Sequence, residues 1–158
     1  MPYAEPAGVP PFDVLPASQR TNRTTMLATV DRFYEALNAH RGNAPEDLST
    51  TCQWTVNGQV LGSCAAPLAG NSLQWIARWR DKLVLAVDEA RGLVAVRVFE
   101  DIPAAPREFA GADSTPRPNP AAYPRSLQIV EVFHFAGGKV EQLFRLSSEL
   151  PYGMPPHR

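Results

Sequence analysis

Hydrophobic residues recur at every third or fourth position over residues 17–42, the spacing that places them on one face of an α-helix. Arg41-Gly42 is a typical helix end, so the pattern predicts a long amphipathic first helix. Pro45, tolerated in a first turn, predicts a short second helix, and Asn71 or Ser72 would cap a third. The apolar positions of the first helix are Met26, Leu27, Val30, Phe33, Tyr34 and Leu37, and those of the third are Leu73, Trp75, Ile76 and Trp79.

The pattern changes to alternation further along the chain, which predicts β-strands joined by tight turns. An irregular strand or a short hairpin is expected at 51–61, around the turn signal Asn57-Gly58. Long strands are expected at 83–87, 93–100, 126–135 and 139–148, with turns at 88–92 and at Gly137-Gly138. Helices that precede a meander of strands predict an α+β domain. A curved antiparallel sheet wrapped against three helices would form a cone with a cavity inside.

Proline-rich segments bound and interrupt this domain. Residues 1–16 predict an extended arm, and 17–158 a single domain. The stretch 103–124 contains six prolines and little periodicity. Such a long loop is either a functional lid that excludes water or a disordered insertion.

Charge and hydropathy exclude several classes of partner. The net charge of −1 argues against a nucleic-acid binder that works by phosphate neutralisation. No apolar run is long enough to cross a membrane. Residues 1–16 lack the basic and apolar regions of a secretory signal, so we expect a cytoplasmic protein or one whose signal has been removed.

The two cysteines, Cys52 and Cys64, lack the spacing of a zinc site. In a cytosolic protein we expect two buried thiols. A disulfide becomes the better interpretation if the protein is exported.

Glu131 is the strongest candidate for chemistry. Strand alternation places it in the row Leu127, Ile129, Glu131, Phe133 and Phe135, a single acid among apolar side chains. A buried carboxyl group either finds a partner or takes up a proton, and enzymes use such groups as acids or bases. The alternative is a structural ion pair with an arginine of a neighbouring strand, such as Arg97 or Arg145.

The strand around Glu131 and the Gly-Gly-Lys-Val turn after it resemble the late hairpin of ketosteroid isomerases. These belong to the NTF2-like superfamily, with the SnoaL-like cyclases and scytalone dehydratase. The resemblance implies an NTF2-like cone and places Glu131 where an aspartic acid donates a hydrogen bond to an enolate oxygen. The stretch 49–54 departs from these enzymes, because it contains no acid where they carry their usual general base.

A wider match covers residues 24–156. Asn57-Gly58, Ser63-Cys64, the turn from Val87 to Val94, and the closing Pro151-Tyr152-Gly153-Met154-Pro155 are similar to a poorly characterised branch of SnoaL-like proteins. This resemblance implies the fold more than the chemistry. It also implies a homodimer through the outer face of the sheet.

Three further residues are candidates for catalysis. Arg97 inside the cone would bind a carboxylate or an oxyanion, or else form a salt bridge to Glu131 or Glu100. Tyr34 on the first helix would act as an acid or oxyanion donor, or else as a core aromatic. His134 suits proton transfer at neutral pH, but its phase is opposite to Glu131 and favours packing or a subunit interface.

A second group consists of candidates for substrate binding, each weighed against a core, turn or ion-pair role. Several aromatic residues at the mouth of a cone would favour an aromatic or polycyclic substrate. Arg78 would bind a substrate carboxylate if it is not an ion-pair residue. The group is Asn57, Trp54, Trp75, Phe99, Phe133 and Arg78.

The chain has no Walker A sequence, dinucleotide-binding fingerprint, H-E-x-x-H zinc sequence or G-x-S-x-G elbow. Cofactor-independent and metal-independent acid–base chemistry remains, which also suits the resemblance. We expect a lyase, isomerase, dehydratase or cyclase acting on a small hydrophobic, aromatic or polyketide-like molecule. A lyase of lignin-derived diaryl compounds is one version. The alternative is a non-catalytic ligand-binding or dimerisation module, in which Glu131 and Arg97 form a buried pair.

Overall fold

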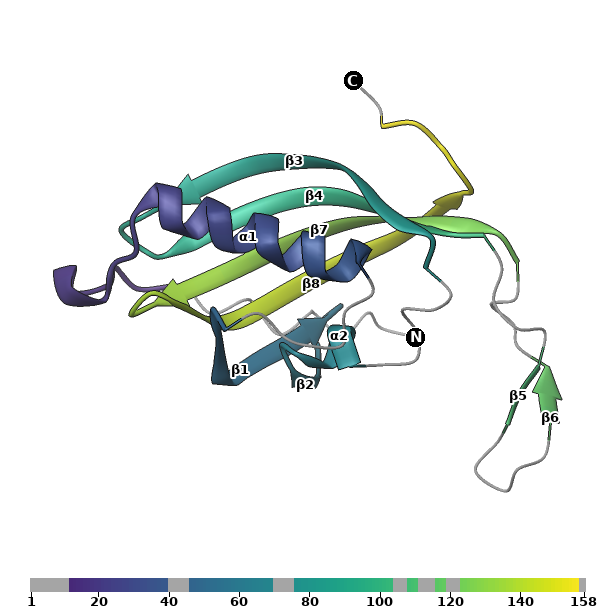
Figure 1. Ribbon diagram of the computed structural model, residues 1–158, viewed down its shortest axis with the longest axis horizontal. Helices are drawn as coiled ribbons and strands as arrows, with labels where there is room; N and C mark the ends of the chain where they lie inside the picture. The colour runs from purple at the N-terminus through teal and green to yellow at the C-terminus, as the bar shows by residue number, and fades with distance from the viewer. Residues whose placement is uncertain are drawn as a thin grey trace, which may run out of the picture.

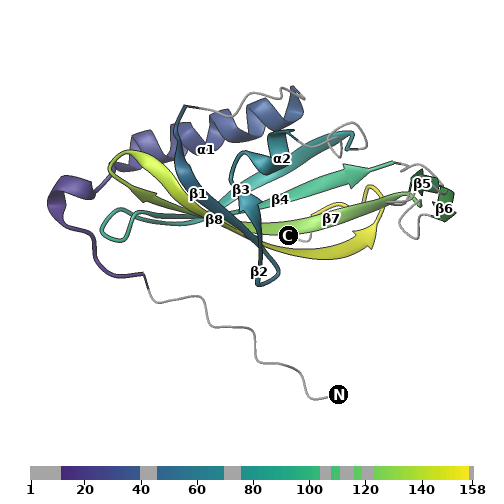
Figure 2. The same cartoon turned by 90° about the horizontal axis from the view of Figure 1, so that it is seen from below.

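The computed structural model describes residues 12–39, 46–69, 76–103, 108–110, 116–118 and 123–156. Its centre is a curved six-stranded sheet in the order β2-β1-β8-β7-β4-β3, with one long helix lying across one face (Figures 1 and 2). β1 and β8 are parallel and the other neighbours are antiparallel. The six strands are β1 (Leu48–Val56), β2 (Gln59–Ser63), β3 (Arg78–Asp88), β4 (Leu93–Ile102), β7 (Arg125–Ala136) and β8 (Lys139–Pro151).

The long helix is α1 (Arg23–Asn38), the predicted amphipathic first helix. It begins later than residue 17 because the Asn22 side chain accepts a hydrogen bond from the Thr25 amide and caps it. Residues before the cap form a short 3₁₀ helix, η1 (Ala17–Gln19). No helix in the described parts of the chain has the length and apolar character needed to cross a membrane.

The prediction of three N-terminal helices is wrong, because α1 is the one long helix among the described residues and α2 (Ala66–Ala69) is a short turn of helix. Where the second helix was expected, β1 begins at Leu48. The third was expected to carry Trp79, which instead pairs with Glu100 near the start of β3. Pairing with β4 outweighs the local helical pattern. The predicted helix start at 71–75 lies outside the described residues.

The predicted hairpins are confirmed, with longer strands than expected. Asn57 and Gly58 form the β1–β2 turn, and Gly92 closes the β3–β4 turn at φ +65°. A Cβ atom on Gly92 would lie 2.1 Å from the Phe135 carbonyl oxygen, so this close approach of two turns requires glycine. Within 103–124 the structure describes a small separate hairpin of β5 (Glu108–Ala110) and β6 (Pro116–Pro118).

The two faces of the sheet differ in character. The inner face packs on α1; Ile129, Glu131, Phe133 and Phe135 of β7 are all fully buried, as the alternation predicted. The residues between them point to the outer face, which is partly exposed. Aromatic contacts join the helix to the sheet, with the Phe33 and Phe133 ring centroids 5.3 Å apart.

Cys52 and Cys64 form a disulfide, so the expectation of two buried thiols is wrong. Cys52 lies in β1 and Cys64 directly follows β2, where its amide also donates to the Cys52 carbonyl oxygen at 3.0 Å. Antiparallel pairing of β1 with β2 brings the two residues together, which spacing alone did not reveal.

Replacing both cysteines by alanine is expected to lower the free energy of unfolding by about 3 kcal/mol, because the bond closes a short loop with a sequence separation of 12. Urea denaturation of the two proteins measures the difference. A reducing agent should destabilise the wild type by a similar amount and leave the double variant unchanged. Equal stability of the oxidised wild type and the variant would contradict this.

The Pro-Tyr-Gly-Met-Pro tail is held by a buried aspartate, Asp101. Arg80 forms a bidentate ion pair with Asp101, at 2.7 and 3.1 Å, and also donates to the Met154 carbonyl oxygen at 2.8 Å. Ser126 donates to Asp101 and accepts from the Gly153 amide. Gly153 turns at φ +72°, so the glycine of this sequence serves a turn that docks the tail.

Stability is expected to fall steeply in acid because of Asp101. Burial raises the pKa of this carboxyl group, but hydrogen bonds from Arg80, Ser126 and Arg78 outweigh it and hold the pKa at about 2, below the ordinary 3.8. A depressed pKa contributes stability above the unfolded value, and about 2 kcal/mol is lost as the pH falls from about 4 through about 2. Unfolding free energies from pH 5 to 2 measure this. Asp101→Asn should flatten the dependence of the unfolding free energy on pH. Asp13→Asn, at an exposed position, should leave that dependence unchanged.

Candidate active site

Glu131 lies at the centre of the inner face, with no exposed surface. Its cross-strand partner on β8 is Arg145, of which 9% is exposed. The Arg145 Nε donates to Glu131 Oε1 at 2.7 Å. The carboxyl group of Glu131 therefore has a buried cation as a direct partner.

Tyr34 reaches the same carboxylate from α1. Its hydroxyl donates to Glu131 Oε2, so the two oxygens of Glu131 have different partners. Burial, followed by the negative charge of Glu131, raises the pKa of Tyr34 well above its ordinary value of 10. Tyr34 therefore remains a protonated donor at neutral pH.

A second buried acid, Glu100 on β4, binds the other side of the same guanidinium. Its Oε2 accepts from Arg145 Nη1 at 3.3 Å and from Trp79 Nε1 at 3.0 Å. Burial raises the pKa of Glu100, and the charge of Glu131 adds to this, while Arg145 opposes it. We call Tyr34, Glu131, Arg145, Glu100 and Trp79 the acid–arginine cluster.

The charges of the acid–arginine cluster are unequal, with two carboxyl groups and one guanidinium. A buried charge without a partner is costly, so the favoured state has one carboxyl group protonated. Glu131 accepts from two strong donors, whereas burial raises the pKa of Glu100, so Glu100 is the candidate for that proton. With the proton there, the cluster would hold a base and a neutral acid on one guanidinium.

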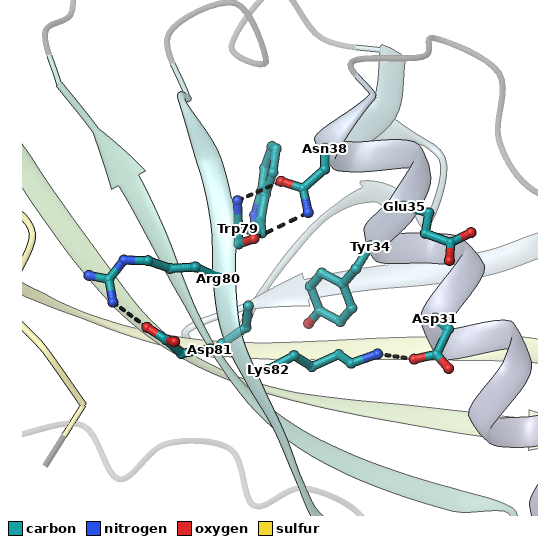
Figure 3. Close-up of a pocket in the computed structure, with 9 residues that line it drawn as sticks. Asp31, Tyr34, Glu35, Asn38, Trp79, Arg80, Asp81 and Lys82 are labelled. Carbon is teal, nitrogen blue, oxygen red and sulfur yellow. Dashed lines mark hydrogen bonds and ion pairs between the residues drawn. The ribbon is translucent and has the colours of Figure 1, made fainter.

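A pocket of about 220 Å³ between α1 and β3 reaches this cluster. Tyr34, Trp79 and Val98 line it, and Val98 lies on the inner face between Glu100 and the residue opposite Glu131. Figure 3 shows Tyr34 pointing from α1 toward β3, with the ion pair of Lys82 and Asp31 beside it. The two aromatic ends of the cluster therefore line one pocket.

The β3 wall of the pocket is irregular. Asp81 has a left-handed backbone, with φ +54°, and the pairing of β3 with β4 shifts register beside it. A non-glycine residue in this conformation is strained and often lies at functional sites. Arg80 and Lys82 on either side both line the pocket, and burial lowers the pKa of Lys82.

The prediction that Arg97 lies inside the cone is wrong. Val96 pairs with Glu131 and Arg97 with Val130, so Arg97 points to the outer face. Its guanidinium lies 5.6 Å from the ring centroid of Phe99, which is buried on that same outer face and so cannot line the inner cavity. The predicted alternation of side chains along β4 was correct. Which of the two alternating rows faces inward is decided only by the register of β4 with β7.

His134 also lies on the outer face, opposite in phase to Glu131 as expected. The Phe12 ring of the N-terminal arm packs on it at a centroid distance of 4.6 Å. Burial lowers its pKa. His134 is therefore remote from the acid–arginine cluster.

The predicted binding residues are dispersed. Asn57 hydrogen-bonds the Ser147 amide from its turn, at 3.0 Å. Arg78 is an exposed partner of Asp101, and Phe133 is a core residue that contacts Phe33 and Tyr34. Trp54 is partly buried with Arg145 stacked on its ring, and Trp75 lies outside the described residues.

Sequence reasoning brought Tyr34 and Glu131 forward but assigned no chemistry to Glu100 or Trp79. Arg145 was considered only as a structural partner. The signal for Glu100 was its place in β4, where it alternates with Val96 and Val98. Arg145 depended on a register shift between His134 and Phe135, which no sequence pattern predicted.

The sequence matches a protein family described as a domain of unknown function (DUF8021) over residues 19–145. The chain belongs to this family. No curated protein sequence matches it significantly.

Solved structures share the fold of this DUF8021 protein. AclR, a putative hydroxylase from Streptomyces galilaeus, has a TM-score of 0.61 at 18% identity, over 82% of this chain and 83% of that one. SalBIII, an epoxide hydrolase/cyclase-like enzyme in pyran ring formation in the polyether salinomycin, has a TM-score of 0.58 at 13% identity, over 80% of this chain and 93% of that one. A putative polyketide cyclase from Xanthomonas campestris pv. campestris has a TM-score of 0.57 at 19% identity, over 80% of this chain and 92% of that one. These likenesses show a shared fold, in agreement with the fold that the resemblance to NTF2-like and SnoaL-like proteins implied.

Proposed function

We propose that this DUF8021 protein is an enzyme that moves protons on a small hydrophobic molecule without a cofactor. The observation that carries the proposal is the acid–arginine cluster, in which one buried guanidinium joins two carboxyl groups and whose aromatic ends, Tyr34 and Trp79, line one pocket. Solved proteins that share this fold are named as a putative hydroxylase, a cyclase-like enzyme and a putative polyketide cyclase, which supports an enzymatic role.

The geometry suits a proton relay through Tyr34. A substrate proton passes to the Tyr34 oxygen while the Tyr34 proton passes to Glu131 Oε2, so no tyrosinate forms. Arg145 orients Glu131 through the hydrogen bond from its Nε to Glu131 Oε1. Glu100, whose pKa is raised by burial, supplies a proton to a second substrate atom. Base and acid are thus separated on one scaffold, as lyase, isomerase, dehydratase and cyclase reactions require.

The substrate in this proposal is aromatic or polyketide-like, because aromatic side chains surround the cluster and the Xanthomonas relative is named as a polyketide cyclase. A lignin-derived diaryl compound is one member of this class. The test is deuterium incorporation from D₂O into the carbon-bound protons of small aromatic ketones, followed by ¹H NMR. Exchange that requires Glu131 supports the proposal, and exchange unaffected by Glu131→Gln contradicts it.

A homodimer through the outer face is part of the proposal. Leu83 and Leu146 are 47% and 62% exposed on strands of this sheet. Arg97 Nε and His134 Nδ1 are buried on this face without a hydrogen-bond partner in the described residues. A second copy would cover the leucines and offer acceptors. Light scattering that returns the mass of one chain would contradict the dimer.

The disulfide bears on location. Cysteine pairs persist in oxidising compartments and are rare in the cytosol. The Cys52–Cys64 bond therefore favours export over the cytoplasmic location expected from the sequence. Two free thiols in protein isolated from its natural source would contradict export.

A further inference from the structure

Asn38, the last residue of α1, binds the main chain of Trp79 at two points. Its Oδ1 accepts from the Trp79 amide at 2.8 Å, and its Nδ2 donates to the Trp79 carbonyl oxygen at 3.2 Å (Figure 3). A carboxamide offers the same kind of donor and acceptor as a peptide group. The side chain of Asn38 therefore takes the place of a neighbouring strand beside Trp79.

This clamp lies at an irregular part of the sheet edge. β3 is the last strand of the sheet, so alternate residues direct their N–H and C=O groups away from β4. Trp79 is one of these residues, since both of its main-chain groups bond Asn38. Regular pairing with β4 stops after Arg80, where the register shifts and Asp81 has its left-handed backbone. Asn38 thus fixes the main chain of Trp79 directly before the irregular stretch.

The position of Trp79 determines one of the hydrogen bonds to Glu100. The indole is buried, and its Nε1 donates to Glu100 Oε2 at 3.0 Å. Burial raises the pKa of Glu100, and the hydrogen bond from Trp79 opposes this by favouring the ionised form. The charged and titratable groups that also act on this carboxyl group are Arg145 of β8, Glu131 of β7 and Tyr34 of α1. A displaced indole would therefore change how readily Glu100 keeps its proton.

The clamp contributes geometry more than stability. Asn38 is exposed, so water can satisfy the edge groups of Trp79 when the Asn38 side chain is removed. We infer that Asn38 is a positioning residue, which holds Trp79 against α1 so that the indole N–H stays on Glu100. The catalytic meaning of this inference rests on the proposed acid–base function, in which Glu100 is the acid. Asn38 lines the same pocket but acts through Trp79.

The test compares Asn38→Ala with Asn22→Ala, which removes an asparagine side chain from the other end of the same helix. Asn22 caps α1 by accepting from the Thr25 amide, so its loss destabilises the helix without touching Trp79. The first readout is the indole ¹H–¹⁵N resonance of Trp79, assigned by its disappearance in Trp79→Phe. In Asn38→Ala the indole proton should move upfield, because its hydrogen bond to the carboxyl group is weakened. In Asn22→Ala it should stay at the wild-type position.

The pH dependence of substrate proton exchange is a second readout, which lost stability alone would not move. A weakened Trp79 hydrogen bond should raise the pKa of Glu100, measured by ¹³C NMR of labelled glutamate. Exchange that needs the protonated acid should then persist to higher pH in Asn38→Ala. Asn38→Asp keeps an acceptor for the Trp79 amide, so it should show smaller changes, and it serves as the test if Asn38→Ala does not fold. A wild-type indole resonance in the folded Asn38 variant, or an equal change in Asn22→Ala, would overturn the inference.

The positioning role and the proposed function fail in different ways. A moved indole resonance and a raised pKa of Glu100 in Asn38→Ala, with no substrate proton exchange in the wild type, support the positioning role and contradict the acid–base function. Exchange that depends on Glu131, with an indole resonance and a pH profile that Asn38→Ala leaves unchanged, supports the function and overturns the positioning role.

Discussion

Glu131→Gln is expected to lower the rate of substrate proton exchange by about two to four orders of magnitude, the usual contribution of a general base. Glutamine keeps the shape of the side chain, and its amide oxygen can still accept from Arg145, while its amide nitrogen can donate to the Tyr34 oxygen. It cannot hold a proton, so the relay through Tyr34 has no acceptor. Single-turnover NMR in D₂O, at pH values from 5 to 9, measures the effect.

The matched control is Glu149→Gln, the same chemical change at a carboxylate on β8 that is 48% exposed and pairs with Arg125. This variant should exchange at the wild-type rate. Tyr34→Phe should resemble Glu131→Gln, since it removes the atom that connects pocket and base. Wild-type rates in both cluster variants, with folded spectra, would leave the cluster as a purely structural feature.

Arg145→Met is expected to lower the free energy of unfolding by about 3–5 kcal/mol at neutral pH. The substitution leaves Glu131 and Glu100 buried together without a cation. Protonation of the carboxyl groups relieves this cost, so the deficit relative to wild type should shrink as the pH falls toward 5. Chemical denaturation at several pH values gives both results.

Two further variants separate the charge effect from lost packing. Adding Glu100→Gln and Glu131→Gln to Arg145→Met removes every charge of the cluster and should restore much of the stability. Arg32→Met breaks the Arg32–Asp47 pair, whose side chains are 48% and 26% exposed, and should cost less than about 1 kcal/mol. A small deficit in Arg145→Met that does not vary with pH would mean that the carboxyl groups are not both buried and coupled.

Local patterns predicted those features that depend on neighbouring residues. Alternation predicted β7 and the buried row around Glu131, and helical spacing predicted the face of α1 that carries Tyr34. The turn residues predicted the hairpins at Asn57-Gly58 and Gly92. Each of these follows from side-chain direction or backbone freedom within a few residues.

The same patterns failed where a distant strand decides the outcome. Helical spacing around Trp79 was outweighed by pairing with β4. Arg97 was assigned to the inner face because alternation identifies two rows without saying which row faces the core. Pairing of β1 with β2 likewise determines that Cys52 and Cys64 form a disulfide, since it brings the two residues close together.

By itself, then, the sequence determined that Glu131 is an acid in a buried apolar row, because strand geometry has a period of two. Only the tertiary structure decided its partner. The turn begins with Ala136 opposite Lys139, a register that would place Phe144 opposite Glu131. A bulge between His134 and Phe135 shifts the pairing by one residue and brings Arg145 there instead. One extra residue in β8 thus converts an isolated buried acid into an acid–arginine cluster, and no local pattern specifies it, because the packing of the whole sheet sets the bulge.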